Sequence, residues 1–175
     1  TTPFGKSTHY GERWLGRADY HTYWYGEPAL YNRYNILLDL THLISTSKPD
    51  HIFTVSEFDK HADHFTTYGL LKLALTDIFQ VDPTYQPTIH KTIVWSTLPA
   101  EWPLPLNPTT YHVEVPDLNQ TDLQWNQRES IDVPIGMQSF DFSNNNKYQA
   151  IASHASQVGV SGFLGKFIHK DEFFW

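Results

Sequence analysis

The chain has 175 residues, of which 40% are hydrophobic and 18% charged, so it is long enough and apolar enough to form one domain over residues 1–175. The formal net charge is −7 and the basic residues are scattered singly, which argues against a nucleic-acid-binding face. The absence of cysteine excludes disulfides and thiolate metal sites, and the sequence has no apolar run long enough to span a membrane.

The first part of the sequence predicts an irregular segment followed by a helix. Residues 1–31 are rich in Gly, Tyr and Trp without a clear period, so we expect loops that turn at glycines. Apolar side chains then recur at helical spacing, which predicts a helix that begins after Asn32 or Asn35 and ends before Pro49. The expected turns are at Gly11, Gly16 and Gly26, and the apolar helix positions are Ile36, Leu37, Leu40, Leu43 and Ile44.

A strand, a loop and a second helix come next. His51 to Val55 is apolar and partly β-branched, which predicts a short buried strand, and the polar run from Ser56 to Lys60 predicts a loop. We expect the second helix from about His61 to about Phe79, and β-branched residues from Thr88 to Trp95 predict a second strand. The apolar stripe of the second helix comprises Phe65, Tyr68, Leu71, Leu75 and Ile78.

The second half of the chain has fewer signals. The prolines between Pro99 and Pro108 are incompatible with a helix or a central strand and predict an excursion over the surface. We expect a strand near Ser130 to Val133, a helix from about Lys147 to Gln157 with its cap between Ser143 and Asn146, and a further turn near Phe163 to Phe167. The alternation of helices and strands indicates an α/β fold with a mostly parallel sheet.

The richest local chemistry lies between the first predicted strand and the second predicted helix. In open α/β sheets ligands bind beyond the carboxyl ends of the strands, and this is where Asp59, His61, Asp63 and His64 occur. His61 and His64 are three residues apart, so at a helix start they can face the same way. Imidazole binds zinc and similar metals, and a nearby carboxylate can fix its tautomer. Two surface histidines at a helix N-terminus would give the same spacing, which leaves both interpretations open.

Three segments resemble the LmbE/PIG-L family of metal-dependent N-acetylglucosaminyl deacetylases. From Pro49 to His64, a Pro-Asp and an apolar strand lead into the family pattern Asp-x-His-x-Asp-His, with Ala62 where the family usually has proline. The residues from Lys147 to Gln157 resemble the family helix Lys-x-x-Ala-x-x-x-His-x-Ser-Gln, and those from Asp171 to Trp175 resemble its closing Asp-Glu-x-Phe-Trp. The resemblance spans about Tyr31 to Trp175 and implies that residues 1–175 are the C-terminal portion of such a domain.

The resemblance implies a fold, a reaction and a role for each site residue. The fold would be a Rossmann-like three-layer α/β/α arrangement, and the reaction would be zinc-dependent (or other divalent-metal-dependent) removal of the N-acetyl group from an amino sugar or glycoconjugate. His64 would be a metal ligand, and His61 would stabilise the oxyanion or protonate the leaving amine. Asp63 would orient His61, and Asp59 would shape the pocket. Such a site fits amide hydrolysis, because a metal activates water and polarises the carbonyl while a neighbouring imidazolium supplies the acid.

The other motif of the family, Ala-His-Pro-Asp-Asp-Glu, is absent from this sequence. His9 has no carboxylate pair after it, and Asp19 and His21 stand in the wrong order. Because a catalytic zinc normally has three protein ligands, we expect a missing N-terminal segment or a complementary chain to supply the other ligands and the first strands of the sheet. The alternative is a non-catalytic carbohydrate-binding or structural relative with an incomplete metal site.

Three side chains outside this cluster are candidates for substrate binding. Trp24 and Tyr25 belong to an aromatic-rich stretch that could stack on a sugar ring or cover the edge of the sheet. His154 lies on the family-like helix near the C-terminus, where it could approach the site or serve helix packing. The sequence gives no indication of the compartment.

Overall fold

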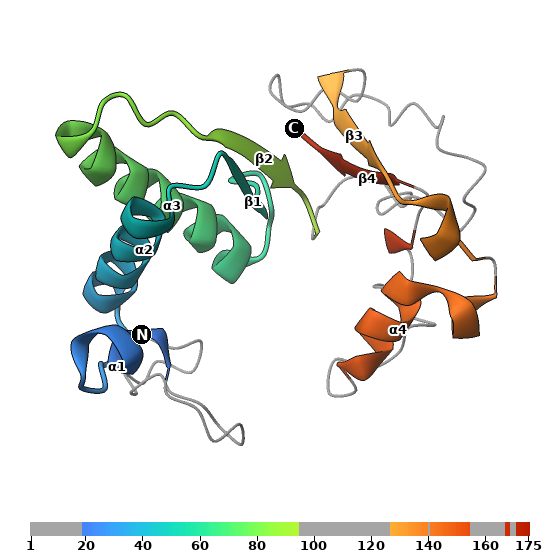
Figure 1. Cartoon of the computed structure of the whole chain (residues 1–175), viewed down its shortest axis with the longest axis horizontal. Helices are drawn as coiled ribbons and strands as arrows, with labels where there is room; N and C mark the ends of the chain where they lie inside the picture. The colour runs from blue at the N-terminus through green and yellow to red at the C-terminus, as the bar shows by residue number, and fades with distance from the viewer. Residues whose placement is uncertain (1–18, 95–126, 140, 155–166, 169–170) are drawn as a thin grey trace. The chain divides into compact units, whose positions relative to one another are not determined.

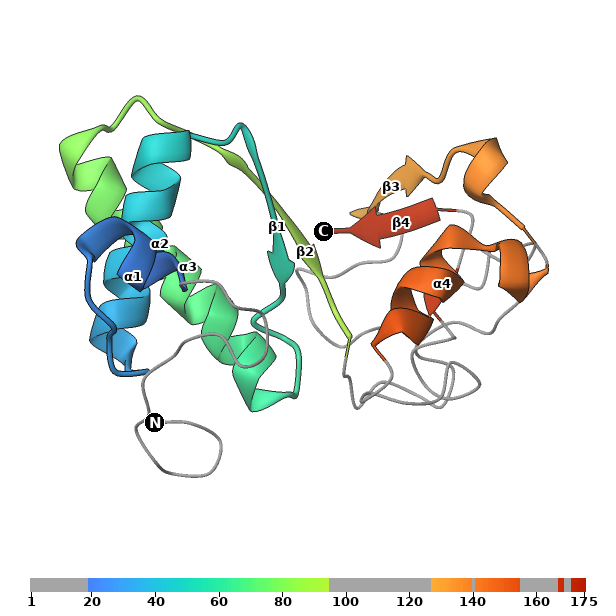
Figure 2. The same cartoon turned by 60° about the horizontal axis from the view of Figure 1, so that its bottom comes forward.

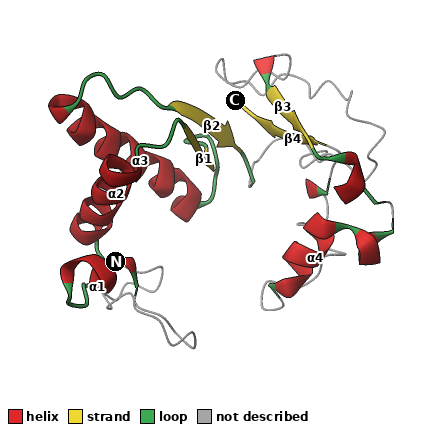
Figure 3. Cartoon of the chain, in the orientation of Figure 1, coloured by secondary structure: helices red, strands yellow, loops and turns green. Residues whose placement is uncertain are grey.

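The computed structural model describes residues 19–94, 127–139, 141–154, 167–168 and 171–175 (Figure 1). The chain divides into two compact units, Thr1–Ile89 and His90–Trp175. Both contain helices and strands (Figure 3), so the expected α/β class is confirmed at this level. The described strands form one parallel and one antiparallel pair.

The first unit begins with a short helix that the sequence analysis did not expect. α1 (Tyr20–Tyr25) lies in a stretch that we predicted to be irregular, and this prediction was wrong for these residues. The side chain of Asp19 caps the helix by accepting from the Thr22 amide at 2.9 Å. Gly26 ends it with a φ of 80°, so the predicted turn at this glycine is confirmed. A helix of six residues is too short to show an apolar period, which is why composition alone missed it.

α2 (Arg33–Ser47) confirms the first predicted helix. Its N-cap is Asn32, the first of the two candidates, whose side chain accepts from the Asn35 amide at 3.0 Å. Lys48 ends the helix in the left-handed region with a φ of 42°, immediately before Pro49. Proline disfavours helical backbone in the residue before it, so the sequence determines this end.

β1 (His51–Val55), α3 (Ala62–Val81) and β2 (Thr88–Thr92) follow, and β1 pairs with β2 in a parallel sheet. The prediction that β1 is buried was wrong: none of its residues is fully buried and Phe53 is 54% exposed, because the described sheet has only two strands. α3 packs against α2 and β1, and Figure 2 shows α2 and α3 side by side. Their shared core consists of buried Ile44, Leu71, Ala74, Leu75 and Ile78. Removing these side chains from water is the main force that holds the two helices together, at about 2 kcal/mol for each large one.

The predicted apolar stripe of α3 is confirmed except at its first residue. Leu71, Leu75 and Ile78 are buried and Tyr68 packs partly buried against them. Phe65 is 56% exposed, so its prediction as a core residue was wrong. It lies in the first turn of α3, where it borders an open groove between the helices instead of the core.

In the second unit β3 (Glu129–Asp132) pairs antiparallel with β4 (Asp171–Phe174), with Glu129 opposite Phe174. The strand predicted near residues 130–133 is confirmed, and β4 was not expected. α4 (Asn146–Ser153) begins at the cap Asn145, whose side chain accepts from the Tyr148 amide at 2.9 Å. The helix ends before His154, although the sequence predicted that it would continue. Short 3-10 turns cover Ile135–Met137 and Phe142–Asn144.

Several predictions fall on residues that the structure does not describe. They are the turns at Gly11 and Gly16, the proline-rich excursion from Pro99 to Pro108, and most of the turn expected near Phe163 to Phe167. β2 ends at Thr92, three residues before the predicted end, and Trp95 also lies outside the described ranges. Within those ranges, none of the helices is both long and apolar enough to cross a membrane.

Candidate functional site

The loop between β1 and α3 is a built turn that begins at a fully buried serine. The Ser56 hydroxyl accepts from the Phe58 amide at 3.1 Å and donates to the carboxylate of Glu57 at 3.1 Å. The Asp59 amide donates to the Ser56 carbonyl at 3.1 Å. These bonds fold the chain back at the carboxyl end of β1, so the next side chains are held at the rim of the strand.

Asp59 joins this turn to the start of α3. Its side chain is 0% exposed. One carboxylate oxygen, Oδ1, accepts from the His61 amide at 2.8 Å, and the other, Oδ2, lies 3.0 Å from Nδ1 of His64. Burial of a carboxylate is costly unless donors or cations surround it, and these two histidines provide such groups. Asp59 therefore holds the backbone of His61 and lies against the imidazole of His64.

His64 is the half-buried member of the cluster. Its side chain is 30% exposed, while Nδ1 itself is buried and is not aligned for a hydrogen bond within the described residues. The contact of Nδ1 with Asp59 is therefore electrostatic. A lone pair facing a carboxylate would be repelled, so this contact favours the tautomer that carries its proton on Nδ1. Nε2 is then the nitrogen that can accept or coordinate.

His61 takes the opposite arrangement. It is the N-cap of α3, and its Nδ1 accepts from the Asp63 amide at 3.3 Å, which requires an unprotonated Nδ1 and places the proton of the neutral ring on Nε2. The carboxylate of Asp63 lies 3.9 Å from the same nitrogen, and the two side chains are 50% and 65% exposed. The His61 and His64 rings have centroids 4.6 Å apart at 36°. Asp59, His61 and His64 are therefore brought together, with Asp63 at their exposed side.

The three candidate substrate-binding residues, Trp24, Tyr25 and His154, lie outside the loop and the first turn of α3 that carry the cluster of Asp59, His61 and His64. Trp24 and Tyr25 lie on α1, and their ring contacts within the described residues are all with α1 and α2. The centroid of Trp24 is 4.8 Å from that of His42, and Tyr25 is 4.6 Å from His21. Burial, then the charge of Asp39, raises the pKa of Tyr25. His154 follows the last turn of α4 in the second unit and is exposed.

Sequence reasoning missed a second histidine–aspartate pair. Nδ1 of His21 on α1 lies 2.7 Å from Oδ1 of Asp39 on α2, and both residues are buried. The two positions are 18 residues apart and one of them lies in the segment predicted to be irregular. One signal was available: Asp39 interrupts the apolar face of its helix between Leu37 and Leu40, and a buried acid there needs a partner.

The donors in this cluster fit one ligand of a zinc site. The carboxylate of Asp59 lies 3.0 Å from Nδ1 of His64, which leaves Nε2 as the nitrogen that could coordinate, as in carboxylate–histidine–metal sites. Within the described ranges, however, no group of three His, Cys, Asp or Glu side chains could hold a metal ion. A complete catalytic zinc site therefore needs donors from elsewhere. The sequence has His9, His112 and His169 outside the described ranges.

Comparison with known proteins adds no relative. The chain matches no family model, no curated protein and no solved structure.

Proposed function

We propose that this chain carries part of the active site of a zinc-dependent N-deacetylase of the LmbE/PIG-L type, which removes the acetyl group from an N-acetylated amino sugar or glycoconjugate. The observation that carries the proposal is the contact of buried Asp59 with Nδ1 of His64, beside a second imidazole. Structural histidines are usually enclosed, whereas this ring is held from one side and open on the other. The sequence resemblance from Pro49 to His64 supports the same conclusion.

Each residue of the cluster has a role in this proposal. Nε2 of His64 would hold the metal, and a bound zinc ion would supply an activated water and polarise the amide carbonyl. Asp59 would keep the His64 proton on Nδ1 and hold the orientation of the ring. Neutral His61 would donate from Nε2 to the oxygen on which negative charge develops.

Asp63 would act when His61 becomes protonated. The Nδ1 atom of His61 accepts from the Asp63 amide in the neutral ring, and a second proton on that atom would break this bond. The carboxylate of Asp63, 3.9 Å away, would then face the new proton and stabilise its charge. The imidazolium, which would take its second proton from solvent, would then donate its Nε2 proton to the leaving amine and become a neutral ring with its proton on Nδ1. The proposal thus assigns acid catalysis to His61 and charge stabilisation to Asp63.

The proposal also includes a Rossmann-like three-layer α/β/α fold for the complete domain. The parallel pair of β1 and β2 joined through α3 is a βαβ unit, and parallel sheets are normally covered by helices on both faces. A Rossmann-like three-layer arrangement would place further strands beside this pair. The remaining metal ligands would come from residues outside the described ranges, from an N-terminal segment or from a complementary chain.

Zinc-dependent acetate release tests the proposal. We expect the complete protein or complex, loaded with zinc, to release acetate from di-N-acetylchitobiose, and a chelator to abolish this activity. His64→Ala should remove the zinc and lower the rate at least about 100-fold, and Asp59→Asn should weaken zinc binding about 10- to 100-fold. His51→Ala, which removes another exposed histidine of the same unit, is the matched control. This variant should keep both the bound zinc and the rate of acetate release.

The outcomes separate the alternatives. Zinc bound through His64 without acetate release from any N-acetylated amino sugar would favour a non-catalytic carbohydrate-binding relative. Zinc content unaffected by His64→Ala would contradict the role of this histidine and favour a structural protein with vestigial histidines.

A further inference from the structure

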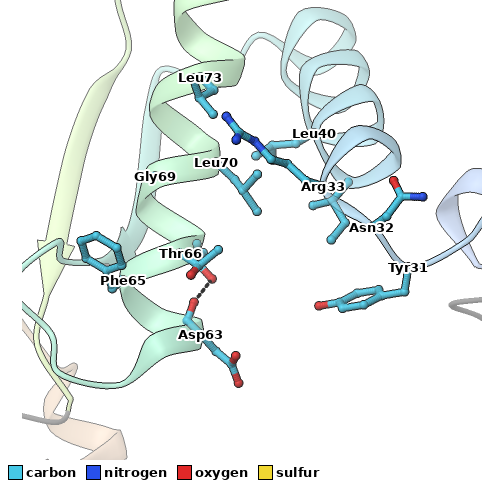
Figure 4. Close-up of a pocket in the computed structure, with 12 residues that line it drawn as sticks. Tyr31, Asn32, Arg33, Leu40, Asp63, Phe65, Thr66, Gly69, Leu70 and Leu73 are labelled. Carbon is cyan, nitrogen blue, oxygen red and sulfur yellow. Dashed lines mark hydrogen bonds between the residues drawn. The ribbon is translucent and has the colours of Figure 1, made fainter. Parts of the chain in front are cut away.

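A groove of about 710 Å³ lies between the first turns of α2 and α3 (Figure 4). Its floor is apolar and is formed by Ile36 and Leu40 of α2 with Leu70 and Leu73 of α3. The α3 wall is open at Gly69, where an added Cβ would meet no heavy atom within 4 Å. Small-molecule sites typically have volumes of about 300–1,000 Å³ and apolar linings with a small number of polar groups, and this groove has both properties.

Arg33 is the cation of this groove. It lies at the first turn of α2, and Figure 4 shows its guanidinium directed across the groove towards α3. Within the described residues, no acidic side chain forms an ion pair with Arg33. Two lysines do have acidic partners there: Lys48 pairs with Asp82, and Lys147 pairs with Glu172. The other charged residue in the lining is Asp63. An arginine beside an apolar floor suits an oxyacid, because its fork of N–H groups matches two oxygens of a carboxylate or a similar oxyanion.

We propose that this groove binds a small molecule with an apolar body and one acidic group. The body would lie on the leucine and isoleucine floor, and the carboxylate or sulfonate would pair with Arg33. This binding requires neither metal nor hydrolysis, so it goes beyond the proposed deacetylase function and does not depend on it.

Two fluorescent probes with the same apolar body test the proposal. 8-Anilinonaphthalene-1-sulfonate carries an acid, and N-phenyl-1-naphthylamine lacks it. We expect the sulfonate to bind at one site, with backbone amide shifts in NMR spectra at Phe65, Thr66 and Gly69. Arg33→Gln should weaken the sulfonate about fivefold and change the affinity of the neutral probe less than about twofold. Lys72→Gln removes a cation of α3 that does not line the groove and should change neither affinity.

Filling the groove provides an independent test. Gly69→Leu should abolish the binding of both probes, because the new side chain enters open space in the groove. The matched control is Gly136→Leu, which introduces the same side chain at an equally open glycine of the second unit and should leave binding unchanged. Circular dichroism of each variant establishes that it is folded.

Three results would overturn the proposal. They are sulfonate binding that survives both Gly69→Leu and Arg33→Gln, amide shifts confined to other residues, and the absence of binding. Chelation of zinc or His64→Ala should have no effect on probe affinity, which separates this result from the fate of the deacetylase proposal.

Discussion

His21 and His64 each lie beside an aspartate in the first unit, with Nδ1-to-carboxylate distances of 2.7 Å and 3.0 Å, but the two pairs differ in what surrounds them. The side chains of His21 and Asp39 are 9% and 12% exposed, and the ring of Tyr25 packs on the histidine. The side chain of His64 is 30% exposed, while that of its partner Asp59 is 0% exposed. An enclosed pair joins two helices, whereas a pair buried only on its acidic side leaves an imidazole nitrogen available for a ligand.

The largest effect should come from breaking the enclosed pair. Asp39→Ala leaves His21 buried without its carboxylate, and the loss of one partner of such a pair should lower the free energy of unfolding by about 3–5 kcal/mol. Urea denaturation followed by circular dichroism measures this change. Asp77→Ala removes an exposed aspartate of α3 and is the control, with an expected change below about 0.5 kcal/mol. Equal losses in the two variants would show that the His21–Asp39 pair does not stabilise the contact of α1 with α2.

Asp59→Ala should have a smaller effect on stability and a specific effect on zinc. The change removes the acceptor of the His61 amide and the partner of His64, which should cost about 1–3 kcal/mol. His64→Ala should cost less than about 1 kcal/mol, because this ring is partly exposed. Thermal denaturation of both variants gives the comparison. A greater loss for His64→Ala than for Asp59→Ala would contradict the view that Asp59 organises the site.

Gly69→Ala should stabilise the protein. Glycine inside a helix is less favourable than alanine by about 1 kcal/mol, and the added methyl group meets no neighbouring atom. The free energy of unfolding should therefore rise by about this amount. A loss of stability would mean that the groove beside Gly69 is filled in solution.

The exposed ion pair of Lys48 and Asp82 should give the smallest effect, visible only in acid. The hydrogen bond from Lys48, then that from Thr84, lowers the pKa of Asp82 from 3.8 to about 2. Because the folded-state pKa lies below the unfolded one, the pair stabilises the protein above pH of about 4, and this contribution is lost as the pH falls towards about 2. Melting temperatures between pH 2 and 6 should show a shallower acid slope for Asp82→Asn. Identical slopes for the variant and the parent would contradict the assignment.

The sequence was sufficient where local signals and burial agreed. Asn32 and Pro49 predicted the ends of α2, and the apolar period predicted most of α3, since caps, a proline and a helical period act over adjacent residues. The apolar and β-branched residues from His51 to Val55 predicted the position of β1. α1 and β4 were missed because a six-residue helix and a four-residue strand depend on distant partners: Asp39 for α1, and Glu129 to Asp132 for β4.

For the candidate site, too, the sequence predicted which residues are involved but not how they contact one another. Its candidate residues were predicted from their spacing and from the family resemblance, and the structure brings Asp59, His61 and His64 together after the loop that follows β1. The particular contacts could not be predicted, because they depend on how the turn after Ser56 is folded. Asp59, which was expected as a carboxylate partner of a histidine and, from the resemblance, to shape the pocket, contacts the His61 amide and the His64 ring, and His61 bonds to the backbone of Asp63. The groove was invisible in the sequence, because it arises where two helices separate.

The protonation of the two adjacent imidazoles tests the central claim most directly. Long-range nitrogen–proton NMR spectra distinguish the two tautomers of each neutral histidine. We expect the proton on Nδ1 in His64 and on Nε2 in His61, and we expect added zinc to shift the Nε2 signal of His64. A His64 ring that carries its proton on Nε2 and does not respond to zinc would contradict the account.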